Sequence, residues 1–286
     1  MLEIPESKTI SIQSDSMLKG KIVTSVFSPK SHHKFTFFNG DPAGYAGILE
    51  GRKILSAKGH GMFVDICFDK DITLTIGEGT NIRYHSPSSQ GPDKYQLLIT
   101  FDDESCISFN VTMYGLIWAY KGHFDNKYHI ISLESISPLD DKFDEAYFNK
   151  LVLSESRDLS AKALLATEQR IPGLGNGVLQ DILFNAGIHP KRKKSKFSDA
   201  ELHKLFQNLK MTLGNMTDLG GRDTERDLFG QSGRYKLSCR RIRQTNPVPF
   251  AMILYGRKPI WVVQSITARH VRSCRVNVKD QVLNLS

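Results

Sequence analysis

Residues 170–190, RIPGLGNGVLQDILFNAGIHP, form the most informative stretch of the chain. A glycine loop at residues 173–176 leads into a run with apolar residues at helical spacing, namely Val178, Leu179, Ile182, Leu183 and Ala186. Gly187 ends this predicted helix, and Pro190 prevents it from resuming. A glycine turn at a helix N-terminus offers free backbone N–H groups at the positive end of the helix dipole, which suits a phosphate.

The segment that follows this helix is strongly basic and reads KRKKSK over residues 191–196. A glycine turn alone is more often a tight turn, and a basic run alone is more often a solvated surface. Residues 1–186 carry 18 Lys/Arg and 23 Asp/Glu, whereas residues 187–286 carry 20 and 7. This asymmetry favours a polyanionic partner. We see no basic amphipathic helix with exposed aromatics, which favours nucleic acid over a membrane surface.

The composition is typical of a protein with one large or two ordinary domains, with 286 residues of which 40% are hydrophobic. No apolar stretch approaches the ~20 residues of a membrane span. The N-terminal residues lack the basic and apolar regions of a secretory signal. The four cysteines, Cys67, Cys106, Cys239 and Cys274, are widely spaced, which indicates reduced thiols in the cytosol.

The first half of the chain reads mainly as β-strands joined by hairpin turns. Apolar residues alternate in three runs, at Met62, Val64, Ile66 and Phe68, at Ile72, Leu74 and Ile76, and at Leu97, Ile99 and Phe101. This pattern predicts a β-sandwich or barrel of about 130 residues. Residues 138–215 read as helices, one of which opens with a capping box at Ser198 and Glu201 and ends near Gly214-Asn215. Glycines and prolines then separate short strands at residues 250–254 and 260–263.

Several separated motifs resemble the formamidopyrimidine-DNA glycosylase / endonuclease VIII (Fpg/Nei) family. The first six residues, MLEIPE, resemble the family's MPELPE start. Residues 163–190 resemble its helix–two-turn–helix, GGRD at 220–223 resembles the lead into its C-terminal finger, and LYGR at 254–257 resembles the finger tip. The resemblance spans nearly the whole chain in the right order.

The resemblance implies an α+β fold. It has an N-terminal β-sandwich with an N-terminal helix (1–135), a helical helix–two-turn–helix domain (136–220) and a β-hairpin finger subdomain (221–286). Only Cys239 is available as a zinc ligand near the finger hairpin, so we expect a zincless finger, no metal and no cofactor.

The resemblance also implies a base-excision-repair enzyme, a DNA glycosylase with abasic-site lyase activity that acts on flipped nucleotides. The alternative is a catalytically altered or inactive relative that binds abasic or damaged DNA without cleaving it. A third class, a ribosomal or RNA-binding protein with the same helical motif, is disfavoured by the N-terminal motif. We expect double-stranded damaged DNA as the partner, no membrane, a monomer, and a location in the bacterial cytosol or nucleoid.

Four residues at the N-terminus are candidates for catalysis. Glu3 matches the family's catalytic carboxylate, and the surrounding motif favours this role over that of an ordinary exposed N-terminal acid. Glu6 matches a second acidic position, or is an acid favoured by the helix dipole. Leu2 replaces the family's nucleophilic proline, so the reactive amine could instead belong to Met1, because a primary amine also forms Schiff bases.

Further family positions differ in this chain. Met62 falls where the family has its hairpin lysine, and Lys58 or His60 could substitute. In the family's apolar wedge loop Glu78 replaces an apolar residue, so Tyr114 could be the wedge that enters the duplex, or a packed aromatic at a strand end.

The phosphate-binding pair of the family corresponds to Asn176 and Arg257, and Asn176 could alternatively be a simple helix N-cap. Gly173, Gly175 and Lys191 complete the expected DNA-binding residues.

Overall fold

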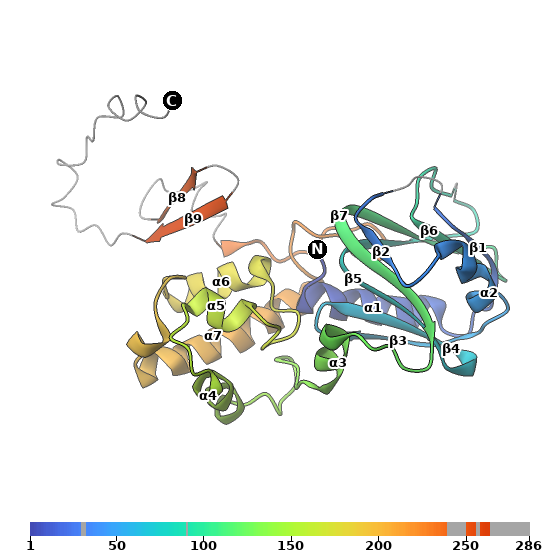
Figure 1. The fold of residues 1–286 in the computed structure, drawn as a ribbon. Coiled ribbons are helices and arrows are strands. Elements are labelled where there is room, and N and C mark those ends of the chain that lie inside the picture. The colour runs from blue at the N-terminus through green and yellow to red at the C-terminus, as the bar shows by residue number, and fades with distance from the viewer. Residues whose placement is uncertain (30–32, 90, 239–249, 256–257, 264–286) are drawn as a thin grey trace, which may run out of the picture. The chain divides into compact units, whose positions relative to one another are not determined.

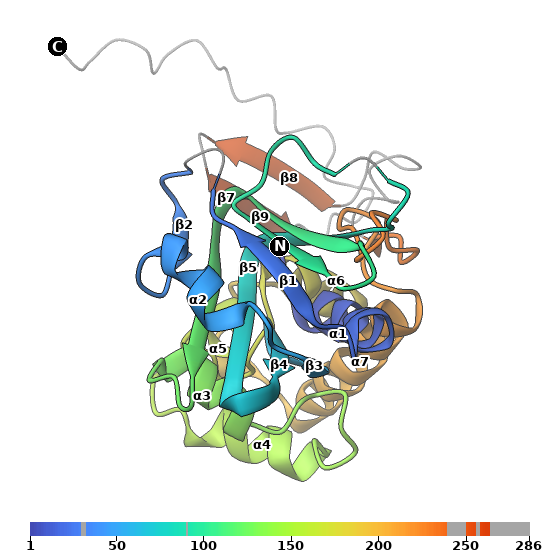
Figure 2. The same ribbon diagram turned by 90° about the vertical axis from the view of Figure 1, so that its right-hand side faces the viewer.

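The computed structural model describes residues 1–29, 33–89, 91–238, 250–255 and 258–263 (Figure 1). The chain divides into two units, Met1–Cys239 and Arg240–Ser286, which are described separately. The first unit contains a β-sandwich followed by a group of helices. The N-terminal helix α1 (Ile4–Leu18) contacts strand β3 of the sandwich and also helix α7, so it joins the two parts (Figure 2). This arrangement confirms the expected α+β class.

Seven strands form one sheet in the order β1-β6-β7-β5-β4-β3, and β2 pairs in parallel with β7. Two short helical turns and one short helix, η1 (Pro42–Gly44), α2 (Tyr45–Leu49) and η2 (Asp69–Asp71), connect them. The strands are β1 (Val23–Phe27), β2 (Thr36–Phe38), β3 (Ile54–His60), β4 (Phe63–Phe68), β5 (Ile72–His85), β6 (Leu97–Phe101) and β7 (Cys106–Lys121).

The long strands β5 and β7 belong to both layers of the sandwich. Residues 72–78 of β5 pair with residues 115–121 of β7 and with β4, whereas residues 80–85 pair with residues 106–111 of β7, which also pairs with β6. The register shifts between Glu78 and Thr80. Such a bulge bends a sheet, so it divides these strands between the two layers.

Among the residues that the structure describes, six helical elements follow the sandwich: α3 (Lys127–Glu134), α4 (Glu145–Ser154), α5 (Ala161–Ala166), α6 (Asn176–Ala186), η3 (Lys194–Lys196) and α7 (Asp199–Asp218). Helix α6 ends at Gly187, whose φ of 68° is the left-handed conformation expected there. The capping box at Ser198 and Glu201 is confirmed. The expected end of α7 near Gly214-Asn215 is wrong. Gly214 faces open space inside the helix, and Met216 is still fully buried in the core.

Two separate hydrophobic cores stabilise the first unit, one inside the sandwich and one among the helices. In the second unit, β8 (Phe250–Tyr255) and β9 (Lys258–Val263) form the antiparallel hairpin that the sequence predicts. The expectation about zinc falls on residues such as Cys239 that lie outside the described residues. Within the described part of the chain, no helix combines the length and the apolar character that a bilayer span requires.

Candidate active site at the N-terminus

The start of the chain lies between the two cores. Leu2 is 5% exposed in the sandwich core, and Ile4 is 3% exposed in the helical core. The backbone N–H of Leu2 donates to the carbonyl of Glu78 at 2.6 Å, and that of Ile4 donates to the carbonyl of Gly173 at 3.1 Å. Glu3 is therefore fixed where the sandwich meets the helix–two-turn–helix.

The carboxylate of Glu3 caps the N-terminus of α6. Gly177 N–H donates to Oε1 at 2.9 Å and Val178 N–H donates to Oε2 at 2.8 Å. A carboxylate at this position accepts N–H groups that the helix cannot use and also interacts favourably with its dipole. The glycine turn alone suggested that these N–H groups are free to bind a phosphate. They are not free, because both donate to the carboxylate of Glu3. Glu3 is buried, so it is not an exposed N-terminal acid.

Two glycines make room for this contact. A Cβ on Gly175 would lie 2.6 Å from the carboxylate carbon of Glu3. A Cβ on Gly177 would lie 1.5 Å from Nη1 of Arg222. No side chain fits at either distance, so the glycine pattern of this turn allows a buried acid and a buried guanidinium to approach the helix N-terminus.

Arg222 links the acidic residues of the N-terminus. Its Nε and Nη2 atoms donate to the two carboxylate oxygens of Glu6, each at 2.9 Å, and Nη1 donates to Oε1 of Glu3 at 3.3 Å. Nη2 also donates to the carbonyl of Met1 at 3.1 Å. Glu6 is thus a buried partner of an arginine and more than an acid favoured by the helix dipole. Arg222 belongs to the GGRD motif at residues 220–223, but no local pattern in the sequence predicts its role.

Burial raises the pKa of Glu3 above its ordinary value, and the nearby charge of Glu6 adds to this rise. Arg222 and the N–H of Val178 oppose the rise without cancelling it. Burial disfavours the charged form of Arg222, but the charges of Glu6 and Glu3 keep its pKa above the ordinary value. Glu3 therefore holds a proton at higher pH than a solvated glutamate does, which is a property of groups that transfer protons.

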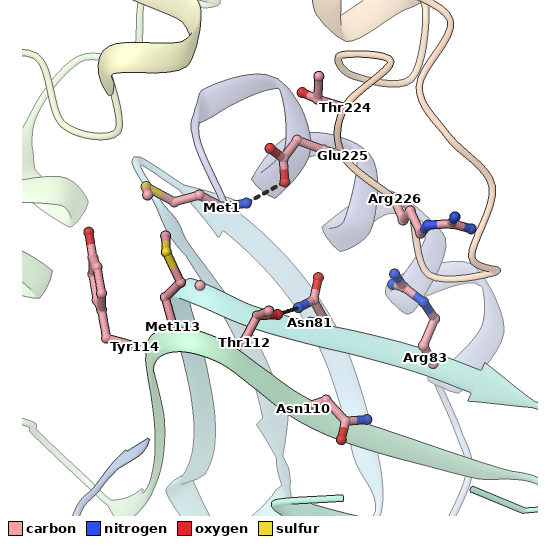
Figure 3. A pocket seen from close by; sticks show the side chains of 11 residues that line it. Met1, Asn81, Arg83, Asn110, Thr112, Met113, Tyr114, Thr224, Glu225 and Arg226 are labelled. Carbon is pink, nitrogen blue, oxygen red and sulfur yellow. Dashed lines mark hydrogen bonds and ion pairs between the residues drawn. The ribbon is translucent and has the colours of Figure 1, made fainter. Parts of the chain in front are cut away.

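A polar pocket of about 460 Å³ opens beside Met1 and is called the Met1 pocket (Figure 3). The terminal ammonium group of Met1 forms an ion pair with Glu225, which follows Arg222 by three residues. Asn81 Nδ2 donates to Thr112 Oγ1 at 3.2 Å within the pocket. The lining residues are Met1, Gly79, Asn81, Arg83, Asn110, Thr112, Met113, Tyr114, Thr224, Glu225 and Arg226.

The segment aligned with the family's wedge loop is the bulge of β5. Glu78 has a φ of 57°, and its carbonyl accepts the N–H of Leu2. Burial raises the pKa of its half-buried side chain. On the facing part of β7, Met113 and Tyr114 are 60% and 39% exposed. Tyr114 therefore remains accessible at the rim of the Met1 pocket.

The candidates for a hairpin lysine lie outside the Met1 pocket. Met62 is in the turn between β3 and β4, where its sulfur is 3.9 Å from Nε2 of Gln169. His60 points to Asp65, at 2.9 Å. Lys58 is exposed and lines a different pocket. Among the described residues, the cations that line the Met1 pocket are Arg83, Arg226 and the terminal amine.

The predicted DNA-binding residues occupy different places. Asn176 is exposed as the first residue of α6, and Gly175 is the N-cap, so the N-cap interpretation of Asn176 is wrong. Lys191 is exposed beyond the C-terminal end of α6, at the opposite end from Glu3. Arg257 lies outside the described residues.

Comparisons with known proteins agree with this geometry. Residues 135–226 match the family model described as the formamidopyrimidine-DNA glycosylase H2TH domain. The formamidopyrimidine-DNA glycosylase of Brevibacillus brevis is 24% identical, over 90% of this chain and 89% of that protein. The Nitrosococcus oceani enzyme is 26% identical over 82% and 84%.

Solved structures show the same fold. The Lactococcus lactis Fpg (MutM) in complex with an N7-benzyl-Fapy-dG DNA superposes with a TM-score of 0.72 at 18% identity and covers 91% of this chain and 97% of that one. The Thermus thermophilus MutM (Fpg) protein gives 0.69 at 17% identity, with coverage of 91% and 96%.

Fold and site together define the class of proteins that join a β-sandwich to a helix–two-turn–helix domain around an acidic N-terminus. Within this class, residues 135–226 form an H2TH domain of the formamidopyrimidine-DNA glycosylase type, and the chain is similar to formamidopyrimidine-DNA glycosylases over most of its length.

Proposed function

We propose that this protein is a base-excision-repair DNA glycosylase with abasic-site lyase activity. The observation that carries the proposal is the buried Glu3, held against α6 and Arg222 beside the polar Met1 pocket. The curated relatives are named formamidopyrimidine-DNA glycosylase. A solved relative carries an abasic-site DNA. Double-stranded DNA with a damaged base or an abasic site is accordingly the proposed substrate.

The proposed nucleophile is the α-amine of Met1. The nitrogen of Leu2 is a peptide N–H that already donates to Glu78, and the Leu2 side chain is buried. The Met1 amine instead lies at a pocket and forms an ion pair with Glu225. Glu225 accepts the proton that the ammonium must lose, the free amine adds to C1′ of the abasic sugar, and water leaves as the imine forms.

Glu3 is the proposed proton-transfer residue of this reaction. Its raised pKa allows the carboxyl group to be protonated at higher pH than a solvated glutamate. Glu6 positions Glu3 through their shared partner Arg222. This assignment makes Glu6 a positioning residue and Glu3 a catalytic one.

The Met1 pocket is the proposed site of the flipped base. Asn81, Asn110 and Thr112 offer amide and hydroxyl groups that can hydrogen-bond a base edge. Tyr114 at the rim can stack on an exposed base. Asn176, Arg257 and Lys191 are the proposed phosphate contacts. The turn at Gly173 and Gly175 would place Asn176, because the N–H groups of both glycines are already bonded within the protein. The protein is proposed to act as a monomer in the bacterial cytosol or nucleoid.

Borohydride trapping on duplex DNA with one abasic site tests the proposal. We expect a covalent adduct that peptide mapping places on Met1, and intact mass shows whether Met1 is retained. Glu225→Gln should lower the trapping rate while affinity for an abasic-site analogue stays within a few-fold. Lys58→Ala is the control and should trap like the wild type, because Lys58 lies outside the pocket.

Tight binding to the abasic-site analogue without any adduct would refute the lyase proposal and support a protein that binds damage without cleaving it. An adduct on Lys58 would retain the lyase but overturn the assignment of Met1.

A further inference from the structure

A second cluster of chemically active side chains lies between strands β3 and β4 and helix α3, away from the Met1 pocket. His60 at the end of β3, Asp65 on β4 and His129 on α3 bring one potential ligand atom each close together. These three atoms lie within 4.8 Å of one another. Their side chains are 12%, 10% and 5% exposed.

The hydrogen bonds around His60 show which of its ring nitrogens carries the proton. The hydroxyl of Ser132 donates its one proton to the carbonyl of His129, at 2.7 Å. Nδ1 of His60 lies 2.7 Å from the same hydroxyl oxygen, so Nδ1 must be the donor of that bond. A neutral His60 then has a bare lone pair on Nε2, which faces the carboxylate of Asp65 at 2.9 Å. Two acceptors at this distance need a cation between them.

From this geometry we propose that His60, Asp65 and His129 bind a divalent transition-metal ion, with Zn²⁺ as the best match. Two imidazole nitrogens and one carboxylate oxygen are ligands that zinc accepts. Tetrahedral ligands at 2.0–2.1 Å from zinc lie about 3.3 Å apart. Nε2 of His60 and Nε2 of His129 lie 2.9 and 3.1 Å from Oδ2 of Asp65, and all three atoms lie within 4.8 Å of one another. Side-chain rotations that bring the two imidazole nitrogens to about the tetrahedral separation would create the site.

The outer partners match those of a metal centre. Metal-bound histidines usually donate the second ring N–H to a fixed acceptor, and metal-bound carboxylates are themselves hydrogen-bonded. Ser132 fills the first role for His60. Thr75 fills the second, because its hydroxyl donates to Oδ1 of Asp65 at 2.6 Å.

The surroundings limit water but leave a route for the ion. Aromatic rings pack around His129, with Phe63 at 5.4 Å between centroids and Phe124 and Tyr120 both at 6.3 Å. On the other side, a pocket of about 330 Å³ reaches His60 and Ser132. Water or a further ligand can complete the coordination from that pocket.

The proposed ion has a structural role that is independent of the glycosylase proposal. It would join β3 and β4 to α3, directly below the hairpin tip at Gly61 and Met62. This tip packs on the helix–two-turn–helix turn, since a Cβ on Gly61 would lie 3.0 Å from Pro172. A metal here fixes the hairpin against the helical core. The expectation of no metal rested on the finger residues alone, because His60, Asp65 and His129 show no metal-ligand spacing in the sequence.

Metal analysis of the full-length protein tests the proposal. After incubation with Zn²⁺ and gel filtration, the wild type should retain one equivalent more than His129→Ala. His203→Ala is the matched control, because His203 also contacts a carboxylate, Glu145 at 2.8 Å, but is half-exposed on α7 and belongs to no such cluster. It should retain the wild-type amount. Equal zinc in wild type and His129→Ala would overturn the proposal and leave a protonated His60 as the cation.

A second measurement covers the case in which His129→Ala does not fold. Co²⁺ added to the wild type should produce visible absorption bands of a four-coordinate site, and equimolar Zn²⁺ should displace them. Zn²⁺ should also raise the Tm of wild type and of His203→Ala by similar amounts. Wild-type protein without Co²⁺ bands and without a Tm shift would refute the site.

Discussion

Two buried carboxylates of this chain, Glu3 and Asp65, differ in their affinity for a proton. Burial is the largest influence on both pKa values and raises each of them. The pKa of Glu3 remains raised, whereas the pKa of Asp65 falls well below its ordinary value. The two residues are 3% and 7% exposed, so the degree of burial cannot explain the difference.

The residues around Glu3 and Asp65 explain the difference between their pKa values. Asp65 accepts from Thr75 and lies against the imidazoles of His129 and His60, and all three neighbours favour its charged form. Glu3 shares one cation with a second carboxylate, because Arg222 also binds Glu6. A like charge next to a buried acid raises its pKa. One buried acid is thus kept as a permanent anion, which suits a structural centre, and the other can exchange a proton, which suits catalysis.

The largest effect is expected from Arg222→Met. This change leaves Glu3 and Glu6 buried without a cation, and breaking a buried ion pair costs about 3–5 kcal/mol. Because Arg222 lowers the pKa of Glu3, its loss would raise that pKa further in the folded state. The contribution of such groups to stability is present at low pH and is lost as the pH rises through the folded-state pKa. Urea unfolding should therefore show a deficit at pH 7 that shrinks towards pH 5.

Arg157→Met is the control for that experiment. Arg157 also pairs with two glutamates, Glu155 and Glu168, but its side chain is 53% exposed. Glu155 is buried but keeps Arg170 as a second cation, and the pair with Glu168 is exposed, so the loss of Arg157 should cost about 1 kcal/mol or less. Equal losses in the two variants would contradict the central role assigned to Arg222.

Asp65→Asn is expected to have the next largest effect, a loss of about 2–3 kcal/mol, because the buried donors Thr75 and His129 lose a charged acceptor. The folded-state pKa of Asp65 is depressed, so its contribution is complete above the ordinary carboxyl range and is lost as the pH falls below about 4. The wild type should lose stability there more steeply than the variant in acid titrations followed by circular dichroism.

Asp103→Asn is the matched control for Asp65→Asn. Asp103 also has a lowered pKa, about 2, but it lies at the surface beside Lys21. Its replacement should change stability by less than about 1 kcal/mol. A small change for Asp65→Asn as well would mean that its hydrogen bonds do not hold the sandwich together.

Gly177→Ala should have an intermediate effect. Gly177 is in α6, and its new methyl group would collide with the side chain of Arg222. Such overpacking costs about 1–3 kcal/mol, and the better helix propensity of alanine offsets part of this cost. Gly214→Ala makes the same substitution in α7, where nothing lies within 4 Å of the new carbon, so it should stabilise by up to about 1 kcal/mol. Thermal unfolding of both variants measures the difference, and a stabilised Gly177→Ala would show that Arg222 does not need this space.

The sequence predicted what local patterns determine. Helix α6 and the capping box of α7 follow from spacing and end residues, and the motif around Glu3 located the candidate site. The partners of Glu3 could not be predicted, because Arg222 reaches it across 219 residues. His129 likewise reaches Asp65 across 64 residues. Such contacts depend on how two cores pack, which no local spacing records.

Tyr114→Ala should leave both buried centres unchanged and alter stability by less than about 0.5 kcal/mol, because Tyr114 is exposed at the rim of the Met1 pocket. If its ring stacks on DNA, affinity for abasic-site duplex should fall by about 1–3 kcal/mol in fluorescence anisotropy. Tyr128→Ala removes another exposed tyrosine, on α3 and outside that pocket, and should bind like the wild type. Equal affinities for the two variants would remove Tyr114 from the DNA interface, and equal losses would indicate a general effect of tyrosine removal. A loss confined to Tyr114→Ala would separate the surface that contacts DNA from the two buried carboxylate centres that hold the fold behind it.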